Sequence, residues 1–545
     1  MKPTDGDIAP RAGALPWLVL AFVVLGGHLS LVPRVADLDG FYHVGHALAY
    51  LESGLTDTSL PWATRSIIAD YRGDLWWGFH VLMIPFAAIG NVGLAMQAAG
   101  FALTALLAAV VGWVLHRHGV QGAGFWAALF LLAVPNIFFR HLMVRPHVVS
   151  MAAGILLLST LAKGRWWHAL LLSALMSWVH LNLFWFAPGI AVAYALARIP
   201  ATTLLGPDQP DEGVPIRYAI PAVIAGTLLG WVLRPEPVQT ALLLNVQLVQ
   251  LFTQKTLAQP LTFAAELSPL DPVTLFRTSW FFWIAWMGSI VYAARSSWAA
   301  AVRDGERSRP WRQDQGTVLI AAFAISVVFF ALTLGSARRA MEQWVSFGVL
   351  GIAVATAPTI APWARSIFRD RHLTAASGIL VVVLLAHLGW GAYRHSLNVT
   401  RVAFPASTMA EVSRFLASES EPGEVVFHAR WDNFGPLFAH NRSNHYLGGM
   451  DPIFQYAHDP RAFWEFFYLS SDVNTEWTCD AYPCPDGIAT DTHTALREHF
   501  GARWVVVEPR RNPRFSLYLL NDDRYRLALE TQREAVFEVL PPATP

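Results

Sequence analysis

The sequence predicts an all-α polytopic membrane domain of about eleven transmembrane helices, followed by a small C-terminal α/β domain. Composition is the first reason. Of 545 residues, 54% are hydrophobic and only 14% are charged, whereas about a quarter of the residues of soluble domains are charged. Periodicity is the second reason. Apolar runs of roughly the 20 residues that span a bilayer recur up to residue 393, and short strand-like segments follow only after residue 397.

The apolar runs that we expect to cross the membrane are, in order, 15 to 33, 94 to 115, 123 to 139, 148 to 162, 166 to 180, 182 to 198, 217 to 234, 274 to 294, 316 to 335, 341 to 360 and 374 to 393. The first run lacks a small-residue cleavage site, so we expect a retained helix rather than a signal peptide. A further window, Leu75 to Gly90, is either a full span or an amphipathic segment in the membrane interface. His80 in this window is expected to be a capped or interfacial histidine.

Basic residues decide between the two topologies. If Leu75 to Gly90 does not cross and the N-terminus is cytoplasmic, four basic loops lie inside, as the positive-inside rule requires. These loops are 116–118, 163–165, 295–312 and 365–371. We therefore expect an integral membrane protein with a cytoplasmic N-terminus and an extracytoplasmic C-terminal domain. The predicted domains are 1–396 in the membrane and 397–545 outside it.

The C-terminal domain shows shorter patterns. Three apolar segments predict buried strands, and two amphipathic segments predict helices. The strands are Glu424 to His428, Arg503 to Glu508 and Ala535 to Leu540, and the helices are Met409 to Ala417 and Thr492 to Phe500. Cys479 and Cys484 would form one small disulfide if this segment is exported, although two free thiols fit the sequence nearly as well.

Charge and motifs argue against several function classes. The formal net charge is zero and Lys is almost absent, so no basic surface favours a nucleic-acid partner. No Gly-rich phosphate loop, Gly-x-Ser-x-Gly or His-Glu-x-x-His occurs, so an ATPase, a serine hydrolase and a zincin find no support. His43 and His46 stand three residues apart, which is weak evidence for zinc without further ligands. No metal ligand is therefore assigned.

Ionisable residues gather at the predicted outer face of the membrane. They are Asp37, Asp39 and His43 after the first span, Arg140, Arg145 and His147 after the third, Glu266 in a long loop, and Arg338 with Arg339 before the tenth. Charged groups at a bilayer are costly, so each is a functional candidate. Arg residues at the outer edge of the membrane are unexpected, because the positive-inside rule places basic residues on the cytoplasmic side. They would suit an anionic ligand such as phosphate. The alternatives are a solvated loop for the carboxylates and Arg that reaches lipid headgroups.

Carboxylates and guanidinium groups around one pocket suit the transfer of a group from a lipid phosphate. A carboxylate can act as a base toward the acceptor or hold a divalent cation such as Mg²⁺ or Mn²⁺, while Arg stabilises the leaving phosphate. The pattern therefore predicts a lipid-linked transferase.

The segment Asp39-Gly40-Phe41-Tyr42-His43 resembles the first extracytoplasmic loop of the GT-C membrane glycosyltransferases, and closely the Asp-x-x-Tyr-His form of archaeal oligosaccharyltransferases. Further pieces follow in the same order. Val134 to Arg140 looks like the second catalytic loop of that family, and Ala265 to Pro269 looks like the loop that places a Glu near the reacting sugar. Arg338-Arg339 looks like the lipid-phosphate Arg.

Two departures separate this chain from oligosaccharyltransferases. Arg145-Pro146-His147 stands where those enzymes carry an acidic metal pair. Trp431 to Gly435 is only weakly similar to the motif with which they read the sequon. The Arg-Pro-His turn and the Trp178 to Asn182 pattern look more like bacterial GT-C enzymes related to protein mannosyltransferases. This resemblance adds the expectation of a bacterial inner membrane.

The resemblance implies an integral-membrane glycosyltransferase that moves a sugar from a polyprenyl-phosphate donor to an extracytoplasmic lipid, glycan or protein. Rival readings are an oligosaccharyltransferase that uses a lipid pyrophosphate, a non-catalytic transporter of lipid-linked sugars, and an assembly partner. The expected partners are the lipid-linked donor and membrane lipids, without nucleic acid. The implied roles are catalytic for Asp39, Asp37 and Glu266, donor-phosphate binding for Arg338, Arg339 and Arg145, and pocket-lining for His43, Tyr42, His147 and Arg140.

Overall fold

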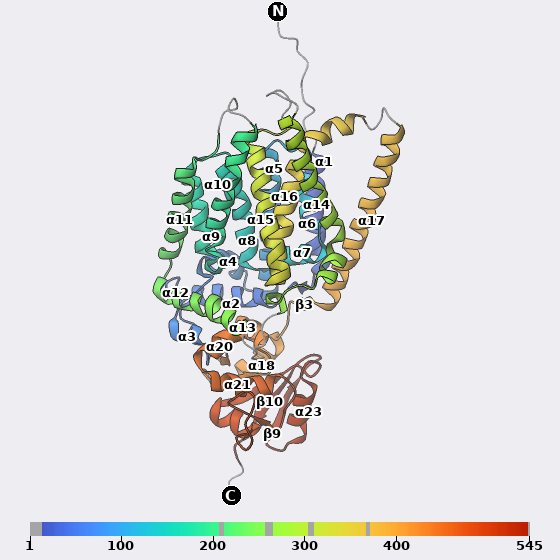
Figure 1. Ribbon diagram of the computed structural model, residues 1–545. Coiled ribbons are helices and arrows are strands. Elements are labelled where there is room, and N and C mark those ends of the chain that lie inside the picture. Colours follow the sequence, from blue (N-terminus) through green and yellow to red (C-terminus); the bar gives the residue numbers. More distant parts are fainter. Residues whose placement is uncertain (1–13, 206–211, 257–264, 303–309, 367–370, 543–545) are drawn as a thin grey trace, which may run out of the picture.

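The computed structural model describes residues 14–205, 212–256, 265–302, 310–366 and 371–542. Long helices stand side by side in a bundle, and a small sheet region lies at one end of it (Figure 1). The principal helices of the bundle are α1 (Leu15–Leu31), α5 (Val92–Arg117), α8 (Pro146–Ala162), α9 (Trp166–Val179), α10 (Phe186–Leu205), α11 (Ile216–Val232), α14 (Pro272–Val302), α15 (Gln313–Gly335), α16 (Met341–Ser366) and α17 (Arg371–Arg401).

The chain is an integral membrane protein. Among the described residues, five helices are long and apolar enough to cross a membrane, or seven if each of two bent pairs is one span. α1, α8 and α9 are apolar but shorter. Helices form at the predicted apolar runs, whereas the total of about eleven spans stays a prediction.

The ambiguous window becomes α4 (Trp77–Ala87). Its 11 residues extend about 17 Å, well short of the roughly 30 Å hydrocarbon core. This length fits the topology in which the window does not cross. α4 packs against α2 (Asp39–Ser53), and His80 is fully buried between them. His80 Nδ1 lies 2.6 Å from Asp74 Oδ2, which fits the capped alternative of the prediction rather than an exposed interfacial side chain.

The predicted span 123 to 139 is not one straight helix. α6 (Ala123–Leu132) and α7 (Pro135–His141) meet at an angle of 100°. Val134, which precedes Pro135, has the extended backbone (φ −136°, ψ 120°) that a following proline favours, and Pro135 then opens the next helix. Arg140 lies near the end of α7, where it pairs with Glu266 and Glu342.

Two glycines allow α9 and α11 to touch backbone to backbone. A Cβ at Gly226 would lie 2.1 Å from the Leu170 carbonyl oxygen, and one at Gly230 would lie 2.0 Å from that of Ala174. Small residues four apart are the usual device for close helix packing in membranes. This contact fixes the wall of the bundle that leads into α12 (Pro237–Asn245), the π-helical turn η2 (Val246–Gln250) and α13 (Leu251–Thr256).

A six-stranded sheet forms the core of the C-terminal region, in the order β2-β5-β4-β8-β10-β9. The predicted strands are confirmed as β4 (Val425–His428), β8 (Ala502–Val507) and β10 (Ala535–Val539), beside β5 (His445–Leu447) and β9 (Tyr525–Glu530). β2, β5, β4 and β8 run parallel to one another, and β10 lies antiparallel between β8 and β9. The predicted helices form α18 (Ala410–Glu419) and α22 (Thr492–Thr494), which continues into η6 (Ala495–His499). Cys479 and Cys484 form a disulfide.

The helical bundle and the C-terminal region contact each other at several places, and three of these contacts hold the segments around α2. The sheet includes β2 (Ala63–Thr64), which lies far upstream in the chain. β1 (Arg34–Val35) pairs with β3 (Phe404–Pro405). α19 (Phe434–His440) packs on α2 so closely that a Cβ at Gly45 would lie 2.7 Å from the Phe438 ring. The C-terminal region therefore packs against α2, the helix that begins at Asp39. The predicted domain boundary at residue 396 stays a prediction.

Candidate functional site

A cavity of ≈ 560 Å³ lies where the bundle meets the C-terminal region. The N-termini of α2 and α8 place Asp39 and Arg145 on its wall, and the short helices η3 (Ala265–Leu267) and η4 (Arg338–Ala340) place Glu266 and Arg339 there. The apolar part of the wall includes Leu248, Leu251, Phe252, Leu267, Phe329 and Leu332. A cavity that is charged in one part and apolar in another suits an amphipathic ligand.

Arg145 holds three carboxylates with one guanidinium group. Its Nε donates to Asp37, its Nη2 lies 2.9 Å from Asp39 Oδ2, and its Nη1 lies 3.1 Å from Glu266 Oε1. Arg145 precedes Pro146, which opens α8, and its extended backbone (φ −139°, ψ 148°) turns the side chain off the helix end. A guanidinium has five fixed N–H donors, so it can hold several carboxylates where a lysine ammonium would hold fewer.

Glu266 and Glu342 extend this ion-pair network. Arg140 donates to Glu342 through Nε and lies 2.8 Å from Glu266 Oε2 through Nη1. Arg339 Nη1 is 3.5 Å from Glu266 Oε1, and His147 Nε2 is 3.7 Å from Glu342 Oε2. Charges out of water are tolerated only when they are paired in this way. The network links α7, α8, η3, η4 and the start of α16.

Asp39 is the most exposed of the three carboxylates that Arg145 contacts. Its side chain is 28% exposed, against 8% for Asp37. Burial raises the pKa of Asp39 to about 7, because the negative charges of Asp37 and Glu266 add to the cost of ionisation and Arg145 only partly offsets it. Burial also raises the pKa of Asp37, against the opposing effect of Arg145. Burial acts the same way on Glu266, but Arg145, Arg339 and Arg140 outweigh it and lower its pKa.

The structure brings most of the predicted site residues together. Asp39, Glu266, Arg145, Arg339, His43 and His147 line the cavity. Asp37 and Arg140 stand behind it in the ion-pair network. Tyr42 is buried against the ring of His46 and does not line the cavity. Arg338 is exposed and also lies off the wall. The roles that sequence resemblance implies for these residues stay predictions.

Other polar residues at the site were not predicted. Glu342 is almost fully buried at the start of a predicted span, and a carboxylate in an apolar run is a signal that could have found it. Asp451 accepts a hydrogen bond from Gln247 (3.1 Å), and Asn182 donates to Gln247 (2.7 Å). Lys255 also lines the cavity. Asp451 and Gln247 are about two hundred residues apart in sequence, so no local pattern could have joined them.

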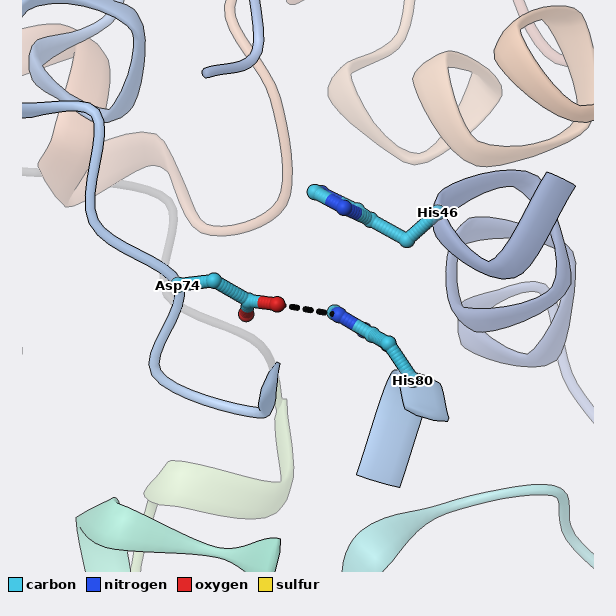
Figure 2. Close-up of side chains that lie close together, drawn as sticks. All are labelled: His46, Asp74 and His80. Atoms are coloured by element: carbon cyan, nitrogen blue, oxygen red, sulfur yellow. Dashed lines mark hydrogen bonds and ion pairs between the residues drawn. The ribbon is translucent and has the colours of Figure 1, made fainter. Parts of the chain in front are cut away.

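One buried group among the described residues has the donor types and spacing to hold a metal ion. It consists of His46, Asp74 and His80 (Figure 2). His80 Nε2 lies 2.8 Å from Nδ1 of His43, which lines the cavity. The group is therefore one side chain away from the cavity wall.

Comparisons with known proteins show which solved structures share the fold of this chain. No protein-family model matches the sequence, and no curated protein matches it. ArnT from Cupriavidus metallidurans, solved with undecaprenyl phosphate bound, matches 98% of this chain and 100% of its own at 14% identity and a TM-score of 0.54. The Archaeoglobus fulgidus oligosaccharyltransferase matches 91% of this chain and 70% of its own at 10% identity and a TM-score of 0.52.

The arabinofuranosyltransferase AftD from Mycobacteria matches 97% of this chain and 41% of its own at 15% identity and a TM-score of 0.54. At these low identities the three likenesses establish a common fold.

The raised pKa of Asp39 can be measured directly. Because this carboxyl group keeps its proton until about pH 7, the infrared band of a protonated carboxylic acid should be present at about pH 6 and vanish by about pH 8. Infrared titration of the reconstituted protein checks this, and the part of the acid band that Asp39→Asn removes is assigned to Asp39. A wild-type spectrum without a titrating acid band in this range would contradict the result.

Proposed function

We propose that this chain, which has the fold of the GT-C glycosyltransferases, transfers a sugar from a polyprenyl-phosphate donor to an acceptor on the side of the membrane that carries the C-terminal sheet. The observation that carries the proposal is the cavity itself. Asp39, with a pKa near neutrality, lines the same cavity as Arg339, and apolar side chains line another part of it.

The cavity matches the chemistry of such a donor. A polyprenyl phosphate has an apolar chain and an anionic head, which suit the apolar residues and Arg339 respectively. Lys255 adds a second cation to the wall. ArnT, which shares the fold, was solved with undecaprenyl phosphate bound.

The proposed reaction is a displacement at the anomeric carbon of the sugar. The acceptor hydroxyl gives its proton to Asp39 as its oxygen bonds to that carbon, and the bond from the carbon to the phosphate oxygen breaks. The phosphate leaves with the electron pair, and Arg339 stabilises its charge. A carboxylate with a pKa of about 7 is suited to general-base catalysis near neutral pH.

We also propose that Arg145 does the work that a divalent cation does in enzymes with an acidic metal pair. Its single guanidinium gathers Asp37, Asp39 and Glu266, which is the task of a cation among carboxylates. Transfer would then need no Mg²⁺ or Mn²⁺ at this position.

The topology belongs to the same proposal. The basic loops favour a cytoplasmic N-terminus and a C-terminal region on the outer side, and the resemblance to bacterial enzymes favours a bacterial inner membrane. The disulfide between Cys479 and Cys484 supports this, because disulfides persist in exported segments.

Replacing Asp39 tests the reaction. Asp39→Asn should lower the transfer of radiolabelled sugar from polyprenyl-linked donors by at least about 10²-fold, because an amide cannot accept the proton. Purified protein in lipid nanodiscs is assayed with wild type alongside, and size-exclusion profiles confirm that the variant is folded. Activity near wild type would overturn the role of Asp39, and flipping of the donor without transfer would favour the transporter reading.

The neighbouring arginines provide a matched pair. Arg339→Gln should raise the apparent KM for the donor about tenfold or more, since a charge-assisted hydrogen bond contributes about 1.5 kcal/mol or more. Arg338→Gln, which removes an equal charge from an exposed side chain off the cavity wall, should leave KM within about twofold. Equal effects of the two substitutions would contradict the assignment of the donor phosphate to Arg339.

A further inference from the structure

Three side chains of the kinds that bind metals, His46, Asp74 and His80, lie close together (Figure 2). His46 comes from α2, Asp74 from the loop before α4, and His80 from α4 itself. All three are at least 97% buried, and one ligand atom of each lies within 4.8 Å of the others. A cluster of this kind is costly inside a protein unless its groups are paired with each other or with a cation.

His46 lacks the partner that its burial demands. Neither of its ring nitrogens has a hydrogen-bond partner, although both are buried. Its ring lies parallel to that of His80, with the centroids 4.3 Å apart. Leaving a buried nitrogen unpaired costs about 1–3 kcal/mol, and a metal ion beside it would remove that cost.

Neighbouring groups form hydrogen bonds with Asp74 and His80, as the surroundings of metal ligands usually do. The Tyr50 hydroxyl and the Trp76 backbone N–H donate to the two oxygens of Asp74, at 2.6 and 2.9 Å. His80 Nδ1 faces Asp74, and its other nitrogen lies 2.8 Å from His43 Nδ1. Metal-bound histidines almost always use the second ring nitrogen for such a hydrogen bond.

We propose that His46, Asp74 and His80 bind a divalent transition-metal ion, with Zn²⁺ the ion that two imidazoles and one carboxylate fit best. His80 Nδ1 and Asp74 Oδ2 now lie 2.6 Å apart. Two ligands at about 2.0–2.1 Å from a tetrahedral ion are about 3.3 Å apart, so the pair must open by about 0.7 Å. The fourth position of a tetrahedral site would be left to a water.

The proposed ion is separate from the reaction assigned to Asp39. It would hold His80, and through His80 it would fix the ring of His43 on the cavity wall. His43, which the sequence pairs with His46, is then a hydrogen-bond partner and not a ligand. The proposal can therefore fail while the transferase function stands, and the reverse is equally true.

Metal content tests the proposal without an activity assay. The protein is purified in detergent through a tag that carries no histidine, incubated with Zn²⁺, desalted and measured by elemental mass spectrometry. Wild type should retain about one ion per chain, and Co²⁺ loaded in its place should give the visible absorption of a bound, low-symmetry ion. His46→Ala and Asp74→Asn should lose the ion.

The control is His141→Ala. His141 is also a fully buried histidine whose nitrogens have no hydrogen-bond partner, but it lies outside the cluster, so its removal should leave the metal content unchanged. Wild type that binds neither Zn²⁺ nor Co²⁺ above background would overturn the proposal, and this result does not depend on whether any variant folds. Retention of the ion by His46→Ala in folded protein would overturn it as well.

Discussion

The contact of Arg145 with Asp37, Asp39 and Glu266 is the interaction on which the site depends. Through this contact Arg145, which immediately precedes α8, connects the loop before α2, the start of α2 and the short helix η3. Without the guanidinium, three carboxylates would face each other in a place with little water, where like charges repel strongly. Removing the Arg145 side chain would therefore disturb all three carboxylates. The same contact would hold the loop of Asp37 and Asp39 in position in a chain that lacks the acidic metal pair of the oligosaccharyltransferases.

The C-terminal region is part of the site and not an attachment to it. It contributes Asp451 and Trp431 to the cavity wall, and α19 presses on α2 at Gly45. The sheet also takes its edge strand β2 from the segment that follows α2. Because α2 is held from both sides, Asp39 and His43 are fixed by contacts that neither region could make alone. This arrangement matches the general need to hold reacting groups by packing rather than by loops.

How far the sequence predicts the structure depends on the range of the interactions involved. Apolar runs and alternating strands are local patterns, so the helices and β4, β8 and β10 could be foreseen. Asp39 and Arg145 could be picked out because charge beside an apolar run is costly, whereas Glu266 was picked out by the resemblance of its loop to that of the GT-C enzymes. The break between α6 and α7 was missed although Pro135 signals it. Asp451 and the partnership of His46 with Asp74 and His80 depend on packing between distant segments, which one sequence does not display.

The most direct measurement of the central claim is a cryo-electron microscopy structure of the protein in nanodiscs with a polyprenyl phosphate. The account predicts density for the phosphate in the cavity within hydrogen-bond distance of Arg339, with the chain along Leu248, Leu251 and Phe252 and open space between the phosphate and Asp39 for the sugar. Density for the lipid phosphate at another surface, with the Arg145 network closed to ligand, would contradict it.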